Sequence, residues 1–202
     1  MTGVEFRREQ WTDAASAALR DLMDAEIQPR YADVIEPGNG PTVSAGDILG
    51  TIVAYVGDEP AGTASLKLTD GYAEVKRVFV APSHRRRGLA ARLLAEVEAL
   101  AREAGYGDVV LETGERQPEA IALYEREGWS PIPPFGPYTN SRGIGRYFTK
   151  SLGPLPVDVE LTAVDCSDAA TTAAGEPAPP AEWSGPYPCT YRSKGCASNG
   201  VG

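Results

Sequence analysis

The sequence predicts one α/β domain at residues 1–152, built on a mixed sheet with helices on both faces, and a disordered tail at residues 153–202. Within the first part, amphipathic helix patterns alternate with strand-like runs rich in Val, Ile, Leu and Phe. Beyond residue 153 the chain is instead rich in Pro, Ala, Thr, Ser and acidic residues. Such a composition cannot bury enough apolar surface to offset the loss of chain entropy on folding, so we expect no second domain.

The N-terminal half predicts four strands and one helix. Thr12 is the expected N-cap of the helix, whose apolar residues recur at helical spacing until Pro29 ends it. A Gly-Asp-Glu-Pro turn at residues 57–60 joins two strand patterns and predicts a hairpin, which a second turn near residue 70 extends to a third strand. The predicted strands are residues 4–7, 51–56, 61–68 and 73–80.

The second half predicts two more helices, each followed by an extended segment. Apolar residues line one face of residues 88–104, and charged residues fall mostly on the other. Pro118 suits the first turn of a helix that runs to about residue 127, where Gly128 closes it. Strands are expected at residues 108–113 and 146–152, with a proline-broken extended segment at 129–134.

Composition and charge exclude several classes of function. The chain of 202 residues has a formal net charge of −9 and lacks the basic footprint of a general nucleic-acid-binding protein. It has no apolar run approaching the ~18–20 residues that span a bilayer, and its N-terminus lacks the apolar stretch of a secretory signal. We therefore expect a cytoplasmic protein that binds neither nucleic acid nor membrane and acts on a small cationic or neutral substrate.

Cysteine and histidine are scarce in the predicted domain. Cys166, Cys189 and Cys196 all lie in the tail, so the domain has no cysteine nucleophile and no thiolate metal site. His84 is the single histidine, which argues against a histidine-rich metal site, and we expect no metal. A Ser-His-Asp triad would need this imidazole, yet three arginines follow it directly. We expect it to be structural or to flank a phosphate.

The most informative segment connects the strand that ends at Val80 to the helix that begins near Gly88. Its turn contains Arg85, Arg86 and Arg87. Backbone N–H groups at the start of a helix have no acceptor within the helix and lie at the positive end of its dipole. Together with a glycine that lets a ligand approach the backbone, this arrangement binds phosphate or diphosphate. A solvated arginine cluster is the alternative, and the sequence has neither a Walker nor a dinucleotide-binding glycine pattern here.

The same segment resembles the GNAT superfamily of acetyl-CoA-dependent N-acetyltransferases. Arg85-Arg86-Arg87-Gly88-Leu89-Ala90 is similar to that family's diphosphate signature, Arg/Gln-x-x-Gly-x-Gly/Ala, and residues 78–82 are similar to its central strand. A second similarity lies at residues 117–129, which look like the family's later helix, Ala-x-x-Leu-Tyr-x-x-x-Gly-Phe. The resemblance covers most of residues 4–152 and implies a mostly antiparallel central sheet, with acetyl-CoA as cosubstrate.

The resemblance implies a cofactor site between the central strand and the next one, which diverge in this family. The backbone of Val78 and Val80 would pair with the pantetheine arm like a missing strand, and the amides of residues 86–91 would hold the diphosphate. Gln117 departs from the family pattern, because many members have Asn there. The implied cofactor-binding residues are Val78, Phe79, Val80, Arg85, Arg86, Arg87, Gly88, Leu89, Ala90, Ala91 and Gln117.

Two acid–base roles are also implied. Tyr124 matches the tyrosine usually assigned as the acid that protonates the departing thiolate, although its place on an apolar helix face also fits core packing. Glu74 lies on the central strand where some members carry a glutamate base, and Glu112 on the following strand is its rival. Either carboxylate could deprotonate an ammonium through water, bind it electrostatically, or be a solvated strand residue. We favour Glu74.

The acceptor is expected to bind between the end of the first helix, at Tyr31, and the segment that contains Phe135 and Tyr138, with Glu112 as a further contact. This segment is either a stiff pocket wall or a covering loop. The implied activity is transfer of an acetyl group from acetyl-CoA to a primary amine of a small molecule or amino acid, by direct attack in a ternary complex. The alternatives are a peptide or protein amine, including the chain's own tail, and a CoA-binding regulatory module. A homodimer is left open.

The tail has features of its own. Cys189 and Cys196 could close a small disulfide loop, which a reducing cytosol disfavours. A compact Cys/Ser/Thr/Lys segment after an acidic Ala/Pro-rich stretch resembles the leader-plus-core layout of ribosomal peptide precursors. We favour a plain disordered extension, and Lys194 could be acylated in either case.

Overall fold

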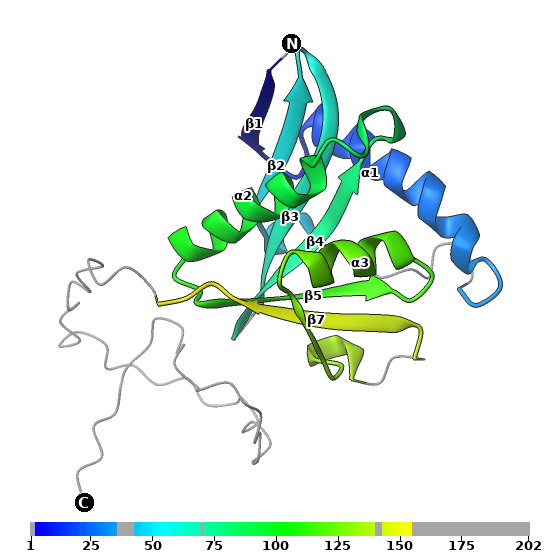
Figure 1. Ribbon diagram of the computed structural model, residues 1–202, viewed down its shortest axis with the longest axis vertical. Coiled ribbons are helices and arrows are strands. Elements are labelled where there is room, and N and C mark those ends of the chain that lie inside the picture. The colour runs from blue at the N-terminus through cyan, green and yellow to red at the C-terminus, as the bar shows by residue number, and fades with distance from the viewer. Residues whose placement is uncertain (1–2, 36–42, 70, 140–142, 155–202) are drawn as a thin grey trace, which may run out of the picture. The chain divides into compact units, whose positions relative to one another are not determined.

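The computed structural model describes residues 3–35, 43–69, 71–139 and 143–154, whose helices and strands are arranged as in Figure 1. The expectations for the tail, including Cys166, Cys189, Lys194 and Cys196, lie outside these residues. The strands of the described part are β1 (Val4–Glu9), β2 (Ile48–Val56), β3 (Glu59–Thr69), β4 (Tyr72–Val80), β5 (Asp108–Gly114), β6 (Ser130–Ile132) and β7 (Gly145–Ser151). The α-helices are α1 (Ala14–Ile27), α2 (Leu89–Glu103) and α3 (Pro118–Arg126), and short 3-10 helices lie at Gln28–Tyr31, Ala45–Asp47, Pro82–His84 and Gly136–Tyr138.

Every predicted strand and helix of the domain is present, but the expected N-cap of α1 is wrong. Asp13, not Thr12, occupies the N-cap, and no side-chain hydrogen bond caps the helix. The Asp13 carboxylate instead accepts a hydrogen bond from the Gln10 amide at 2.8 Å and closes a turn before the helix. As expected, the α-helix ends directly before Pro29, at Ile27, and the backbone continues as the 3-10 turn Gln28–Tyr31, because a proline at the start of a new turn has no N–H bond to lose.

The described strands form one seven-stranded sheet in the order β1-β2-β3-β4-β5-β7-β6. Neighbouring strands are antiparallel except for β4 and β5, which run parallel and pair only at residues 73–75 with 109–111. Both strands continue past this contact, β4 to Val80 and β5 to Gly114, and Figure 1 shows them diverging. The fold class is the predicted mixed, mostly antiparallel sheet, with a gap opening in its middle.

An irregularity in β4 lies where the divergence begins. The register between β3 and β4 shifts between Thr63 and Ser65, and Arg77 on β4 has a positive φ of 55°. A bulge of this kind bends its strand and increases the local twist. We attribute the turning of β4 away from β5 to this bulge.

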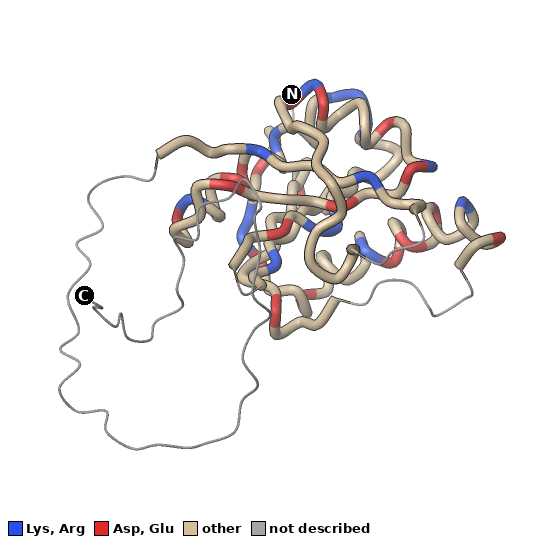
Figure 2. Tube along the Cα trace, turned by 90° about the horizontal axis from the view of Figure 1, so that it is seen from below, with Lys and Arg blue, Asp and Glu red and all other residues tan. Residues whose placement is uncertain are grey.

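Helices cover both faces of the sheet (Figure 1). α2 buries the apolar stripe that its sequence predicts, and with α3 it covers one face, where Leu93 and Val97 pack with Val75 of β4. α1 lies on the other face, where Leu19 packs with Phe79. Because side chains alternate across a strand, Glu74 and Lys76 of β4 point away from α2 and α3. Basic and acidic residues are interspersed along the described chain (Figure 2).

Gly62 on β3 lies close both to the backbone of β4 and to the side chains of α2. A Cβ atom there would stand 2.8 Å from the carbonyl oxygen of Phe79 and 3.0 Å from a methyl group of Leu93. We expect Gly62→Ala to lower the free energy of unfolding by about 1–3 kcal/mol, because neither the strand backbone nor the packed helix can move freely. Urea denaturation measures the change. Gly46→Ala is the matched control, since its nearest neighbour would be 3.8 Å away, and equal losses in both variants would contradict the packing argument.

Candidate functional site

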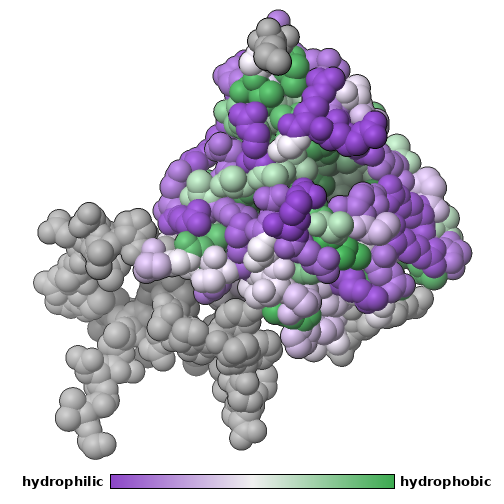
Figure 3. All heavy atoms as spheres, viewed as in Figure 1, coloured by the Kyte–Doolittle hydropathy of each residue, from purple (hydrophilic) through white to green (hydrophobic). Residues whose placement is uncertain are grey.

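A cleft of about 330 Å³ opens beside the diverging end of β4, and α1, the turn before α2, the first residues of α2, and α3 line it. In the space-filling view, hydrophobic surface in this region is bordered by hydrophilic residues (Figure 3). Arg87, alone among the predicted cofactor-binding residues, does not line the cleft. The predicted residues that do line it are Val78, Phe79, Val80, Arg85, Arg86, Gly88, Leu89, Ala90, Ala91, Gln117 and Tyr124.

The turn between β4 and α2 presents a row of backbone amides to the cleft. Arg86 and Gly88 both adopt left-handed conformations, with φ of 61° and 76°, and α2 begins directly afterwards at Leu89. The amides of residues 86–91 donate to no acceptor among the described residues, whereas the Arg92 amide bonds the Gly88 carbonyl at 3.2 Å. Unpaired amides at a helix N-terminus, next to left-handed turns, form a concave anion-binding site.

Gly88 has a conformational role besides the expected one of letting a ligand approach the backbone. An added Cβ would meet no described atom within 4 Å, but the positive φ at this position strains any residue with a side chain. Arg86 takes the same region of φ without being glycine, which marks the turn as locally strained.

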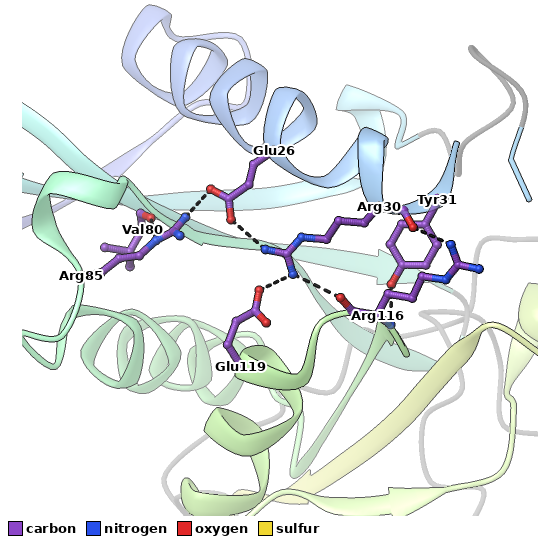
Figure 4. A network of polar contacts seen from close by, with 7 residues as sticks. All are labelled: Glu26, Arg30, Tyr31, Val80, Arg85, Arg116 and Glu119. Carbon is purple, nitrogen blue, oxygen red and sulfur yellow. Dashed lines mark hydrogen bonds and ion pairs between the residues drawn. The ribbon is translucent and has the colours of Figure 1, made fainter. Parts of the chain in front are cut away.

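Arg85 is engaged within the protein (Figure 4). Its Nε donates to the carbonyl oxygen of Val80 at 2.8 Å, and its Nη2 donates to Glu26 of α1 at 2.6 Å. Phe79 and Ala81 direct their backbone groups toward β3. Because these groups alternate along a strand, the backbone N–H and C=O groups of Val78 and Val80 point away from β3, toward the gap. Arg85 therefore caps one of the carbonyl groups that face the gap.

The same network crosses the mouth of the cleft (Figure 4). Arg30, in the 3-10 turn after α1, donates to Glu26 at 3.1 Å and is hydrogen-bonded to Glu119 in the first turn of α3. Arg30 also donates to the backbone carbonyl of Arg116 at 3.2 Å. Two carboxylates, Glu26 and Glu119, thus line the cleft, and each is paired with an arginine. Sequence analysis missed both acids, because their partners lie 59 and 89 residues away along the chain.

Tyr124 is buried at the inner end of the cleft. Its ring packs against Trp129 and Phe148, with centroid separations of 6.0 and 5.8 Å. Burial raises the pKa of the phenol well above its ordinary value, and the nearby charge of Glu112 adds to the shift. The hydroxyl is therefore protonated throughout the neutral range, so that it can serve as an acid while its ring packs in the core.

Glu74 and Glu112 belong to one buried cluster on the α1 face of the sheet. Glu74 Oε1 accepts hydrogen bonds from Tyr138 Oη at 2.8 Å and from Lys76 Nζ at 3.1 Å. Lys76 Nζ also donates to Tyr138 Oη at 2.7 Å and lies 3.7 Å from Glu112 Oε2. Lys76 is a residue that sequence analysis overlooked, since a lysine in an alternating strand pattern ordinarily faces solvent.

Tyr31 and Phe135 lie outside the lining of the cleft. The Tyr31 hydroxyl accepts a hydrogen bond from the Arg116 amide at 2.9 Å and so holds the end of α1 to the loop before α3. Phe135 packs edge-on against Tyr72 and Tyr138, at centroid separations of 5.4 and 5.2 Å. The aromatic segment therefore packs over the sheet beside Glu74, to which Tyr138 donates a hydrogen bond.

His84 is buried and lines the cleft beside the turn. Its Nε2 lies 3.3 Å from Glu59 Oε1, without the geometry of a hydrogen bond. Within the described residues no grouping of His, Cys, Asp and Glu side chains could hold a metal ion. None of the helices in that part of the chain is long and apolar enough to cross a bilayer.

Comparison with known proteins identifies related sequences and folds. Residues 7–129 match the acetyltransferase (GNAT) family. The chain is 44% identical over 77 residues to IAA acetyltransferase of Azospirillum brasilense, which covers 38% of this chain and 50% of that protein. It is 36% identical over 120 residues to N-acetyltransferase 8 of Mus musculus, covering 59% of this chain and 49% of that protein. The chain thus spans about half the length of these curated relatives.

Solved structures share the fold. A Klebsiella pneumoniae protein named as an acyl-CoA N-acyltransferase is 28% identical with a TM-score of 0.63, covering 76% of this chain and all of that one. A GNAT family acetyltransferase from Elizabethkingia anophelis, solved with acetyl-CoA bound, is 18% identical with a TM-score of 0.53 and covers 74% of this chain and 98% of its own.

The contacts of Arg85 predict a structural contribution that Arg86 lacks. We expect Arg85→Met to lower the free energy of unfolding by about 1–2 kcal/mol, because one hydrogen bond to the backbone and one half-exposed ion pair are lost. Arg86 has no partner among the described residues and has the same side-chain length, so Arg86→Met should change stability by less than about 0.5 kcal/mol. Urea unfolding of the two variants tests this difference. Equal stabilities would show that the Arg85 contacts contribute nothing measurable.

Proposed function

The chain belongs to the acetyltransferase (GNAT) family, and we propose that it transfers an acetyl group from acetyl-CoA to a primary amine of a small molecule or amino acid. The observation that carries this proposal is the row of unpaired amides at residues 86–91, which opens into a cleft that ends at Tyr124. Such a site suits a ligand with a diphosphate at one end, an extended arm and a reactive group at the other.

The residues of the cleft fit coenzyme A in three respects. The amides of residues 86–91 and the guanidinium of Arg86 would bind the diphosphate. The unpaired edge of β4 at Val78 and Val80 would align the amide groups of the pantetheine arm by strand-like hydrogen bonds. Arg85 donates a hydrogen bond to the Val80 carbonyl, so the arm would compete with Arg85 for this one group. The Elizabethkingia neighbour, solved with acetyl-CoA bound, supports the fit at the level of the fold.

Acetyl transfer needs a neutral amine, attack on the thioester carbonyl and a proton for the departing thiolate. The amine nitrogen forms a bond to the carbonyl carbon as the carbon–sulfur bond breaks. Tyr124 donates its phenolic proton to the sulfur, and a carboxylate of the Glu74–Glu112 cluster takes the proton that the nitrogen loses. The products are an amide and CoA, and the phenol regains a proton from the carboxylic acid through solvent.

Turnover with Tyr124→Phe tests the chemistry. We expect the wild-type chain to acetylate at least one compound in a panel of primary amines and amino acids, and the variant to lose about 100-fold in kcat, the ordinary contribution of one general acid. Its Kd for acetyl-CoA should stay within about twofold, because the phenol contacts only the departing sulfur. Tyr55→Phe, a buried tyrosine on β2, is the control and should keep wild-type kcat.

Several outcomes of the same assay would contradict the proposal. If acetyl-CoA binds but no amine is acetylated, the chain would be a CoA-binding module. If Tyr124→Phe keeps full activity, Tyr124 is not the general acid. A chain that ends at Leu155 should keep its activity toward small amines. Loss of turnover in that truncated chain would favour the alternative in which a peptide amine of the tail is the acceptor.

Calorimetric titration with acetyl-CoA tests the phosphate site. We expect Arg86→Met to raise the Kd about 10-fold, since a charge-assisted hydrogen bond to phosphate contributes about 1.5–3 kcal/mol and this side chain is partly exposed to solvent. The defect should shrink as the salt concentration rises, because salt screens exposed charges. Arg7→Met on the edge strand β1 is the control and should bind like the wild type. An unchanged Kd in Arg86→Met at low salt would exclude this arginine from the site.

A further inference from the structure

We propose that Glu112 of β5 accepts the proton from the attacking amine, and that Lys76, which Glu74 holds in place, is the positioning residue beside this carboxylate. The inference rests on the proposed acetyl transfer and assigns roles within the same site. It departs from our preference for Glu74, which rested on the position of that residue in the strand alone.

The three residues are neighbours because of the parallel register of β4 and β5. Glu74 is paired with Val110, so Glu112 lies two residues further along, beside Lys76, and all three side chains point to the α1 face. The Lys76 ammonium therefore lies between two carboxylates, 3.1 Å from Glu74 and 3.7 Å from Glu112. The cluster holds one positive and two negative charges.

Glu74 is closed to a substrate. Its side chain is 0% exposed, and one of its oxygens already accepts two hydrogen bonds, from Tyr138 and Lys76. The other oxygen is buried without a partner among the described residues. Tyr138 contacts the carboxylate and Phe135 packs against the Tyr138 ring, so an amine could reach this fully buried group only if the aromatic segment moved.

Glu112 is open by comparison. It is the first residue of β5 beyond the stretch that pairs with β4, so it stands at the point where the two strands separate. Its side chain is 20% exposed, and its contact with Lys76, at 3.7 Å, is longer than a hydrogen bond. Tyr124 lies on the α2 and α3 face of the sheet, whereas Glu112 lies on the α1 face, so the thiolate proton and the amine proton would be handled from the two faces of the sheet.

Burial and the neighbouring charges shift the pKa of the Glu112 carboxyl in opposing directions. Burial raises the pKa of this carboxyl above its ordinary value, and Glu74 raises it further, while Lys76 and Arg77 lower it. A moderately raised pKa makes a carboxylate a better base, provided that it is still ionised at the working pH. Lys76 supplies that condition. The titratable and charged groups that face Glu112 are Glu74, Lys76 and Arg77 on β4, Tyr124 on α3, Tyr138 in the 3-10 helix Gly136–Tyr138, and Tyr147 opposite it on β7.

Rates with the best amine from the panel distinguish the two glutamates. We expect Glu112→Gln to lower kcat/KM about 100-fold or more, with the Kd for acetyl-CoA unchanged. Glu74→Gln should keep most of its activity, since an amide can still accept from Tyr138. Glu112→Asp, which keeps the carboxylate on a shorter stem, should recover part of the rate. The reverse pattern, with Glu74→Gln inactive and Glu112→Gln active, would overturn the assignment.

A titration that needs no substrate tests the role of Lys76. The carboxyl carbon of Glu112 can be followed by NMR in chain labelled with ¹³C at the glutamate carboxyls, and assigned by its loss in Glu112→Gln. Lys76→Met removes a positive neighbour, so the midpoint should move to higher pH. Glu74→Gln removes a negative neighbour, so the midpoint of the Glu112 titration should move to lower pH. Lys150→Met, which breaks the separate ion pair with Glu98 at 2.8 Å, is the control and should leave the midpoint unchanged.

The two measurements separate this inference from the proposed function. If no amine is acetylated, the proposed function fails, while the NMR midpoints still report whether Lys76 controls the charge of Glu112. If amines are acetylated and the midpoints of Lys76→Met and Glu74→Gln move in the same direction or not at all, the inference fails and the function stands. Circular dichroism and the acetyl-CoA Kd of each variant show whether it is folded.

Discussion

The brief pairing of β4 with β5 is the constraint on which the site depends. Only residues 73–75 and 109–111 pair, after which a bulge at Arg77 turns β4 away. Unpaired backbone groups in the middle of a sheet cannot be left buried, because an unsatisfied N–H or C=O costs as much as a lost hydrogen bond. The gap must therefore be filled by an extended ligand or capped by a side chain. Arg85, bonded to the Val80 carbonyl, is such a cap.

Electrostatics explains why so many charged residues surround a cleft suited to an anion. Glu26 and Glu119 line the cleft and would repel a diphosphate, but each is bonded to an arginine. The positive charges of Arg30 and Arg85 are therefore already neutralised by these carboxylates, and the ion pairs hold the end of α1 to α3 and to the turn before α2. The positive potential that remains comes from the backbone amides at the start of α2 and from Arg86, whose left-handed backbone belongs to the same turn. An anion-binding site made of backbone N–H groups does not require a charged side chain to be buried away from water.

Much of the domain could be predicted because its signals are local. The strand, the arginine turn and the amphipathic helix lie within about thirty residues of one another, and the spacing of apolar residues along α2 matches its buried stripe. The partners of Arg85 could not be predicted. Three adjacent arginines look equivalent in sequence, yet only Arg85 bonds Val80 and Glu26, through contacts that the fold of distant segments creates. The cap of α1 was misplaced by one residue because Thr12 and Asp13 have nearly equal propensities for that position.

Lys76 shows why a buried polar cluster escapes sequence reasoning and why its geometry carries information. In a strand that alternates between faces, Glu74, Lys76 and, on the next strand, Glu112 would all be assigned to solvent, yet Phe135 and Tyr138 cover that face. Burying a single charged side chain is unfavourable unless an opposite charge lies beside it. The three charged side chains can lie beside one another only if the register between β4 and β5 is fixed. That register is set at residues 73–75, the same contact that ends where β4 and β5 diverge. The strand pairing that opens the cleft toward α2 and α3 therefore also places Glu112 where the two strands separate, on the opposite face of the sheet.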